Sequence, residues 1–256
     1  MTVPRITAVR TEGEGPALVL GPSLGTSTAL WDPAVPALRN RFGLLAWDLP
    51  GHGESPVARE GFTMGELADA VVDAADEAGI EQFFYAGVSI GGAVALELAL
   101  RHPERVKGVA VICSAAVLGT PEGWQARAAS VRAQGTPMLV SASAARWFAP
   151  GTIARKPEIT SRLLHTLSDA DDESYALCCE ALAGYDVRER LGEIDVPVIS
   201  IAGAEDPVAT PEDAALIASS VRNGQSLTLT DVAHLAPSEA PQQTAEALIR
   251  FFLKEI

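Results

Sequence analysis

Hydrophobic residues recur along this chain in short apolar runs, and amphipathic stretches separate the runs. Glycine, proline or charged residues bound each run, as is typical of buried strands. The runs lie at residues 16–20, 44–48, 83–86, 106–113 and 196–201. Between the second and third runs, Thr63 and Glu66 form the capping box of a helix whose apolar positions keep helical spacing as far as Gly79. Strands and helices that alternate in this way predict βαβ units and a mostly parallel sheet.

Shorter signals extend the pattern toward both ends of the chain. Residues 6–10 predict a first strand, and the glycine-bearing residues 12–15 predict a hairpin turn that leads into the next strand. Residues 31–41 predict one amphipathic helix, and residues 210–221 predict another. Residues 225–230 alternate in hydrophobicity with a period of two, which predicts a last strand, and a helix with one apolar face follows.

The alternation is interrupted between residues 117 and 185, where no strand-like run occurs. This segment predicts helices that are separated by prolines and by a cluster of aspartates. They lie at residues 121–134, 140–148, 159–167 and 172–182. We therefore expect residues 1–117 and 186–256 to form an α/β core, and residues 118–185 to form a helical cap inserted into it.

Composition narrows the possible functions. The chain has 256 residues, of which 48% are hydrophobic, so it can bury a substantial core. Its net charge of −14 argues against nucleic-acid binding, which needs a basic face. The start of the chain has no apolar signal segment, and no stretch approaches the roughly 18 apolar residues of a membrane span. We therefore expect a cytoplasmic protein without a membrane segment.

The three cysteines are Cys113, Cys178 and Cys179, and an odd number favours reduced thiols. Neither member of the adjacent pair has a histidine at ligand spacing, so we expect no metal site there. The sequence predicts no particular oligomeric state.

The strongest chemical signal is Gly87-Val88-Ser89-Ile90-Gly91, with a buried strand before it and good helix formers after it. This is the G-x-S-x-G nucleophile elbow in the strand–turn–helix context that gives the motif meaning. Side chains at the two glycine positions would collide with the neighbouring strand or helix. The turn presents a serine hydroxyl at a helix N-terminus, where N–H groups favour a developing oxyanion. We therefore predict that Ser89 is a nucleophile.

A serine nucleophile needs a general base, and the chain has four histidines. His52, in a glycine turn, and His102, at a helix end, are interpreted as structural residues. His165 is expected to line or cover a pocket in the cap. His234 follows the last strand, in a loop at the carboxyl edge of the sheet, where the sites of such folds gather. In proteins with the elbow motif, the histidine follows the serine and the acid along the chain. His234 fits this order and is therefore the predicted base.

An acid must orient this base, and Asp206 lies just past the preceding strand. Its neighbour Glu205 would point the other way, and Asp231 is interpreted as a turn residue. Asp48 is expected to bond backbone groups in the turn around His52. Asp206 is therefore the predicted acid.

Two backbone N–H groups are the predicted oxyanion hole. The residue after the nucleophile, Ile90, would supply one donor. Leu24, in the glycine-bearing loop after the strand at residues 16–20, would supply the other.

Together these motifs resemble those of α/β-hydrolases with a helical cap, and the likeness covers essentially the full chain. Within that superfamily the chain is most similar to the 3-oxoadipate enol-lactonases. The narrower likeness lies in Ser23-Leu-Gly-Thr26, Ala145-Arg-Trp-Phe148 and the stretch from Ser174 to Leu182. Pro22 and Pro50 depart from the family pattern, which usually has asparagine and arginine at these positions.

The resemblance implies a mostly parallel eight-stranded sheet flanked by helices. It also implies hydrolysis of 3-oxoadipate enol-lactone, without a metal or organic cofactor, in the degradation of aromatic compounds. Ser89, Asp206 and His234 would form a catalytic triad, and the partner would be a small lactone or ester. This substrate keeps one free carboxylate, for which Arg146 is the candidate cation, with Trp147 as an apolar wall.

Other functions share these residues. A carboxylesterase, or a carbon–carbon bond hydrolase of aromatic ring-cleavage products, would carry the same triad, and only the cap would distinguish it. A ligand-binding protein of this fold without turnover is a more distant alternative, against which the complete set of three residues argues. For the two cap residues themselves, the alternatives are that Arg146 is a solvated surface arginine and that Trp147 packs the cap on the core.

Overall fold

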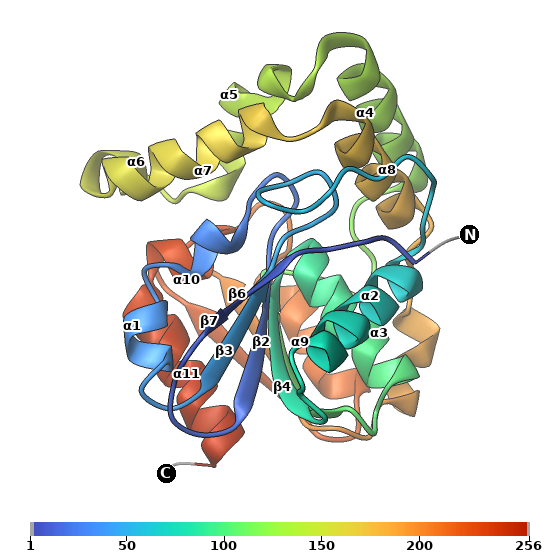
Figure 1. The fold of residues 1–256 in the computed structure, drawn as a ribbon. Helices are drawn as coiled ribbons and strands as arrows, with labels where there is room; N and C mark the ends of the chain where they lie inside the picture. The colour runs from blue at the N-terminus through green and yellow to red at the C-terminus, as the bar shows by residue number, and fades with distance from the viewer. Residues whose placement is uncertain (1–2, 255–256) are drawn as a thin grey trace.

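A seven-stranded sheet lies at the centre of the computed structural model, which describes residues 3–254 (Figure 1). Its strands are β1 (Ala8–Thr11), β2 (Ala17–Gly21), β3 (Gly43–Trp47), β4 (Phe83–Val88), β5 (Val106–Ile112), β6 (Val198–Gly203) and β7 (Gly224–Leu229). Within the described residues the order is β1-β3-β2-β4-β5-β6-β7, and every neighbouring pair is parallel except β1 with β3. All of β6 and nearly all of β4 are buried, which explains their continuous apolar sequences.

Two expectations are wrong at the β1 edge of the sheet. The described residues contain seven strands rather than eight, and β1 pairs with β3 instead of forming a hairpin with β2. Just before β1, the carbonyl of Thr7 continues the pairing with β3 by accepting from Asp48 N–H (3.0 Å), whereas the N–H of Thr7 leaves the ladder and donates to Ser55 Oγ (2.7 Å). Pro4 has no N–H to give to a ladder. The predicted turn at residues 12–15 therefore joins two strands that are not neighbours.

Helices cover both faces of the sheet. Helices α1 (Val35–Leu38) and α11 (Pro241–Leu253) lie on one face, and α2 (Met64–Glu77), α3 (Ile90–Arg101) and α9 (Pro211–Ser220) lie on the other (Figure 1). Three shorter elements are η1 (Thr28–Trp31), η3 (Arg188–Glu193) and α10 (Ala236–Glu239).

The single helix expected at residues 31–41 is wrong, because the structure has the separate elements η1 and α1 there. Pro33 lies between the two elements, and Pro36 lies in the first turn of α1. Proline lacks the N–H that a continuous helix needs, so it is tolerated only in a first turn.

Helix α2 begins and ends as its sequence predicts. Thr63 Oγ1 accepts from the N–H of Glu66 (3.1 Å), and the Glu66 carboxylate accepts from the N–H of Thr63 (2.8 Å). Gly79 follows the helix with φ of 71°, a conformation that glycine adopts without strain.

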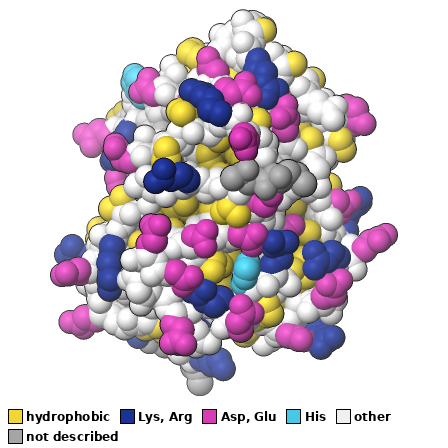
Figure 2. Space-filling view, turned by 45° about the vertical axis from the view of Figure 1, so that its right-hand side comes forward, with side chains coloured by type: hydrophobic (Ala, Val, Ile, Leu, Met, Phe, Trp, Pro, Cys, Tyr) yellow, Lys and Arg dark blue, Asp and Glu magenta, His cyan; other side chains and the backbone are white. Residues whose placement is uncertain are grey.

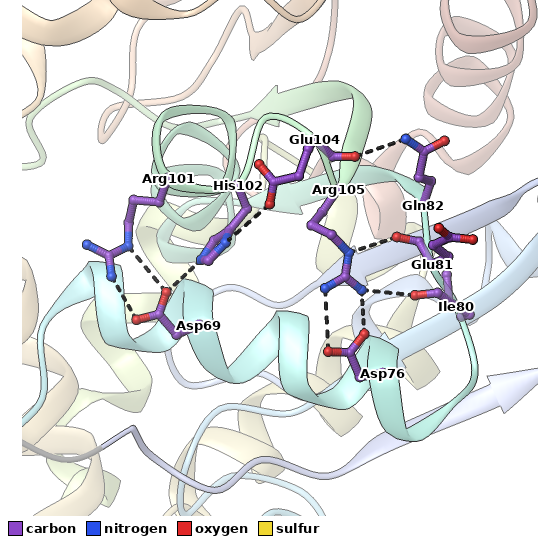
Figure 3. A network of polar contacts seen from close by, with 9 residues as sticks. All are labelled: Asp69, Asp76, Ile80, Glu81, Gln82, Arg101, His102, Glu104 and Arg105. Atoms are coloured by element: carbon purple, nitrogen blue, oxygen red, sulfur yellow. Dashed lines mark hydrogen bonds and ion pairs between the residues drawn. The ribbon is translucent and has the colours of Figure 1, made fainter.

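Ion pairs fasten α2 to the end of α3 and to the segment that leads into β5 (Figure 3). Asp69 accepts from Arg101 (2.7 Å) and contacts His102 Nε2 (2.6 Å), and Asp76 pairs with Arg105. His102 is therefore part of a surface network, as the sequence predicted for a structural residue.

Between β5 and β6 the chain forms helices above the sheet (Figure 1). They are α4 (Pro121–Gln134), η2 (Thr136–Leu139), α5 (Val140–Trp147), α6 (Thr152–Arg155), α7 (Pro157–Asp169) and α8 (Asp172–Ala183), and we call them the cap helices. The four helices predicted for this segment are present as α4, α5, α7 and α8, and α4 packs against α8. The sequence did not predict the short elements η2 and α6.

The surface carries charges of both signs. On the face shown in Figure 2, basic and acidic side chains are interspersed over both the upper and the lower part of the molecule, and apolar side chains are visible where the two parts meet. Within the described residues, no helix is both long enough and apolar enough to cross a membrane.

Candidate active site

Ser89 lies at the sharp turn between β4 and α3, with φ of 57° and ψ of −116°. A residue other than glycine rarely adopts this backbone conformation. A Cβ atom at Gly87 would lie 2.0 Å from the Gly91 carbonyl oxygen, and one at Gly91 would lie 2.6 Å from the Pro22 carbonyl oxygen. The expectation that these two positions require glycine is therefore confirmed.

Two backbone donors near Ser89 are unused. Within the described residues, the N–H groups of Leu24 and Ile90 have no hydrogen-bond partner. The loops that carry them are joined, because the N–H of Gly91 donates to the Pro22 carbonyl (3.1 Å). Unpaired donors that are fixed beside a serine hydroxyl can bind an oxyanion.

His234 and Asp206 form a buried pair. His234 Nδ1 lies 2.9 Å from Asp206 Oδ2, and the two side chains are 4% and 0% exposed. The other carboxylate oxygen of Asp206 accepts from the N–H of Val208 (2.8 Å), which fixes the plane of the carboxylate. Asp206 contacts Nδ1 rather than Nε2 of His234, and Ser89 lines the same pocket as His234.

The other acids lie elsewhere. Glu205 and Asp231 are exposed and line a separate hollow of about 530 Å³, and Asp231 takes a turn conformation with φ of 57°. Asp48 accepts from the N–H groups of Thr28 (2.6 Å) and Glu54 (2.9 Å). Asp48 therefore bonds a backbone group beside the predicted turn, and it also bonds the first residue of η1.

Two other histidines also lie outside the pocket of Ser89. His52 is buried, its Nδ1 lies 2.9 Å from the Pro50 carbonyl oxygen, and its ring stacks on Tyr175. Burial lowers the pKa of His52 to about 4, which keeps its ring neutral near pH 7. The expectation for His165 is wrong: this side chain is exposed and bonds the Ser161 carbonyl (2.8 Å), because α7 buries two of its leucines and turns this position to solvent.

A pocket of about 340 Å³ lies between the core and the cap helices, and Ser89, His234 and Leu24 line its core side. On the cap side, Trp147 is 5% exposed and packs edge-to-face on Phe148. The Trp147 carbonyl accepts from the N–H of His234 (3.2 Å), so this residue both lines the pocket and joins the cap helices to the core.

Arg127 and Arg146 also line this pocket, and neither takes part in an ion pair within the described residues. Arg146 is half-buried and approaches only the hydroxyl of Ser143 (3.5 Å). Burial and the neighbouring Arg127 lower the pKa of Arg146. The guanidinium of Arg127 lies 5.0 Å from the ring centroid of Trp124. The pocket therefore carries positive charge that an anionic ligand could neutralise.

Sequence analysis singled out Arg146, rather than Arg127, as the candidate pocket cation. Trp124 and Arg127 are three residues apart on α4, a spacing that places both on one face of a helix. That spacing could have indicated that Arg127 lies beside an aromatic wall of the pocket. It is not specific, however, because many exposed helix faces carry such a pair.

A family profile described as alpha/beta hydrolase fold matches residues 16–241. The chain belongs to the α/β-hydrolase family. It is therefore an enzyme, a hydrolase of the class that includes esterases and lactonases. The seven strands and their flanking helices agree with this assignment.

Relatives of known name and structure extend over nearly the whole chain. The 3-oxoadipate enol-lactonase 2 of Acinetobacter baylyi is 36% identical over 94% of this chain and 91% of its own. A pimeloyl-acyl-carrier-protein methyl ester esterase of Aeromonas hydrophila subsp. hydrophila is 30% identical over 93% of this chain and 96% of its own. The crystal structure of the enol-lactonase from Burkholderia xenovorans LB400 matches with a TM-score of 0.92 and 32% identity, over 98% of this chain and 96% of that one.

Proposed function

We propose that this chain opens the ring of 3-oxoadipate enol-lactone and releases 3-oxoadipate, with Ser89 as nucleophile, His234 as general base and Asp206 as the acid that orients it. One observation carries the proposal: the pocket that Ser89 and His234 line is also lined by two arginines that form no ion pair with any described residue. The names and the full-length similarity of the enol-lactonase relatives add support.

The first half of the reaction makes an acyl-enzyme. Ser89 Oγ attacks the lactone carbonyl while His234 Nε2 accepts its proton, and Asp206 stabilises the imidazolium. The N–H groups of Leu24 and Ile90 bind the oxyanion of the tetrahedral intermediate. The ring carbon–oxygen bond then breaks, His234 protonates the enolate that leaves, and the enol becomes a ketone.

The second half releases the product. His234 takes a proton from water, and the resulting hydroxide attacks the acyl carbonyl in the same oxyanion hole. Collapse of this second intermediate returns the proton to Ser89 Oγ and frees 3-oxoadipate. No step of this sequence needs a metal or an organic cofactor.

The cap helices would select the substrate. A carboxylate that enters a largely apolar pocket loses hydration, and a nearby cation offsets that cost. Arg146 can bind a carboxylate through two hydrogen bonds of its planar guanidinium, and Arg127 adds a second positive charge. Trp147 would hold the apolar ring. In this proposal residues 118–185 act as a cap that recognises the anionic side chain.

The test is a panel of three substrates: the enol-lactone, a neutral p-nitrophenyl ester, and a dienoate from aromatic ring cleavage. We expect the highest kcat/KM on the enol-lactone. Preference for the neutral ester would instead indicate a general carboxylesterase, and preference for the dienoate would indicate a carbon–carbon bond hydrolase. Absence of turnover on all three would favour a binding protein.

A further inference from the structure

Hydrogen bonds from several other segments fix the loop that carries His234. The N–H of Ala233 donates to Glu239 Oε1 (2.9 Å), and the carbonyl of Ala233 accepts from Cys113 Sγ (3.5 Å). The N–H of His234 itself donates to the carbonyl of Trp147 in the cap helices (3.2 Å). The position of the His234 ring therefore depends on contacts that come from outside its own loop.

Glu239 also reaches the cap helices. Its second carboxylate oxygen, Oε2, accepts from the N–H of Ala149 (2.7 Å) and from Thr152 Oγ1 (3.1 Å). Lys156, at the end of α6, donates to the carbonyls of Ser238 (3.1 Å) and Glu239 (2.8 Å). One carboxylate thus accepts three hydrogen bonds, with one oxygen on the histidine loop and the other on the segment that follows α5.

We propose that Glu239 is a positioning residue, whose carboxylate fixes His234 and the Trp147 wall of the pocket relative to each other. This inference rests on the proposed role of His234 as the base. An ionised carboxylate has two acceptor oxygens and no donor, so it can serve two separate N–H groups at once. An amide of the same shape cannot, because its NH2 group would face the N–H of either Ala233 or Ala149.

The experiment compares wild type with Glu239→Gln in the reaction of Ser89 with a p-nitrophenyl phosphonate. The rate of p-nitrophenol release depends on proton removal by His234, whereas the final amount per chain counts correctly folded serine sites. We expect the rate to fall about 10–100-fold, as small displacements of catalytic groups produce, while the final amount stays near one per chain. A merely structural role would lower the final amount and leave the rate of the labelled fraction unchanged.

Two further variants separate the effect of negative charge on the labelling rate from the effect of the length of the Glu239 side chain. Glu239→Asp keeps the charge but is too short to serve both segments, so it should also slow the labelling, and it provides the test if Glu239→Gln does not fold. Glu205→Gln removes a negative charge from an exposed side chain on the adjacent loop, and its labelling rate should match wild type.

The outcomes distinguish the two proposals. Wild-type labelling rates in both Glu239 variants would overturn the positioning role alone. Failure of wild type to label at Ser89 would overturn the proposed nucleophile, and the positioning role with it. An equal slowing in Glu205→Gln would show that local charge, rather than the bonds of Glu239, controls the rate, and would also overturn the positioning role.

Discussion

The two sides of the pocket are built differently. On the core side, Ser89 and Ile90 directly follow a buried strand, and the Asp206 carboxylate is bonded to both His234 and a backbone N–H. On the cap side, Arg127 and Arg146 are long side chains on helices, where Arg127 lies over the Trp124 ring and Arg146 approaches the Ser143 hydroxyl. The groups that react with the substrate must be held in fixed positions, whereas a guanidinium can bind a carboxylate from several positions. Changes on the core side should therefore affect every substrate, and changes on the cap side only anionic ones.

The largest effect is expected from Ser89→Ala. Hydrolysis of both the enol-lactone and a neutral p-nitrophenyl ester should fall by several powers of ten, because loss of a triad member leaves only about 10³–10⁴-fold catalysis over water. The measurement is kcat/KM on both substrates, with circular dichroism to show that the variant is folded. Activity near wild type on either substrate would remove Ser89 from the mechanism.

Asp206→Asn should be the next most damaging change on the core side. A neutral amide cannot hold His234 in the required tautomer or stabilise the imidazolium, so kcat should fall by up to about 10⁴-fold for both substrates. Asp231→Asn is the matched control, since Asp231 is exposed and lines a different hollow. Equal losses in the two folded variants, or a larger loss in Asp231→Asn, would show that Asp206 is not the orienting acid.

On the cap side, Arg146→Ala should lower kcat/KM for the enol-lactone by roughly 10–100-fold and change the neutral ester by less than about threefold. The loss is moderate because Arg146 is only half-buried and Arg127 remains in the pocket. Arg162→Ala is the control, because this cap arginine is exposed and pairs with Asp32. Equal losses on both substrates would mean that Arg146 supports the cap helices instead of binding substrate.

The smallest effect concerns stability, away from the pocket. Asp69→Asn should lower the free energy of unfolding by about 0.5–1 kcal/mol, as for other partly exposed ion pairs, and leave kcat/KM unchanged. Burial alone would raise the pKa of Asp69, but hydrogen bonds from Arg101 and His102 outweigh it and lower this pKa below its ordinary value of 3.8.

A carboxyl group with a lowered pKa in the folded state stabilises that state above its unfolded pKa and loses the effect as the pH falls through its folded pKa. The difference between wild type and Asp69→Asn should therefore shrink as the pH is lowered from about 6 to below about 3.8. Urea unfolding at several pH values measures it. A difference that stays constant over this range would contradict the assignment.

Much of the fold could be predicted because its signals are local. Apolar runs predicted five of the seven described strands, shorter signals predicted β1 and β7, and the capping box predicted the first residue of α2. Two errors have different causes, one in tertiary pairing and one in a local proline signal that the apolar periodicity masks. Pairing of β1 with β3 rather than β2 depends on where the backbone of Thr7 bonds, and a break near Pro33 divides a stretch whose apolar periodicity looks continuous.

The residues of the site could likewise be predicted where local signals fix them, and could not where distant contacts do. The elbow around Ser89 could be read from glycine spacing, because steric limits act between residues that are close in sequence. Arg127 and Glu239 could not be ranked in this way. Whether Arg127 faces the pocket depends on how α4 packs on α8, and the proposed role of Glu239 rests on its bond to Ala149, 90 residues away in sequence.

In the proposed enzyme, one pocket joins a serine hydrolase centre to a carboxylate-binding wall. The most direct measurement compares kcat/KM for the enol-lactone with that for its methyl ester, in which the side-chain carboxylate is neutral. Wild type should prefer the free acid by at least about 10-fold, and the double variant Arg127→Ala, Arg146→Ala should lose that preference while opening the methyl ester at nearly the wild-type rate. Wild-type enzyme that opens both lactones equally well would contradict the account.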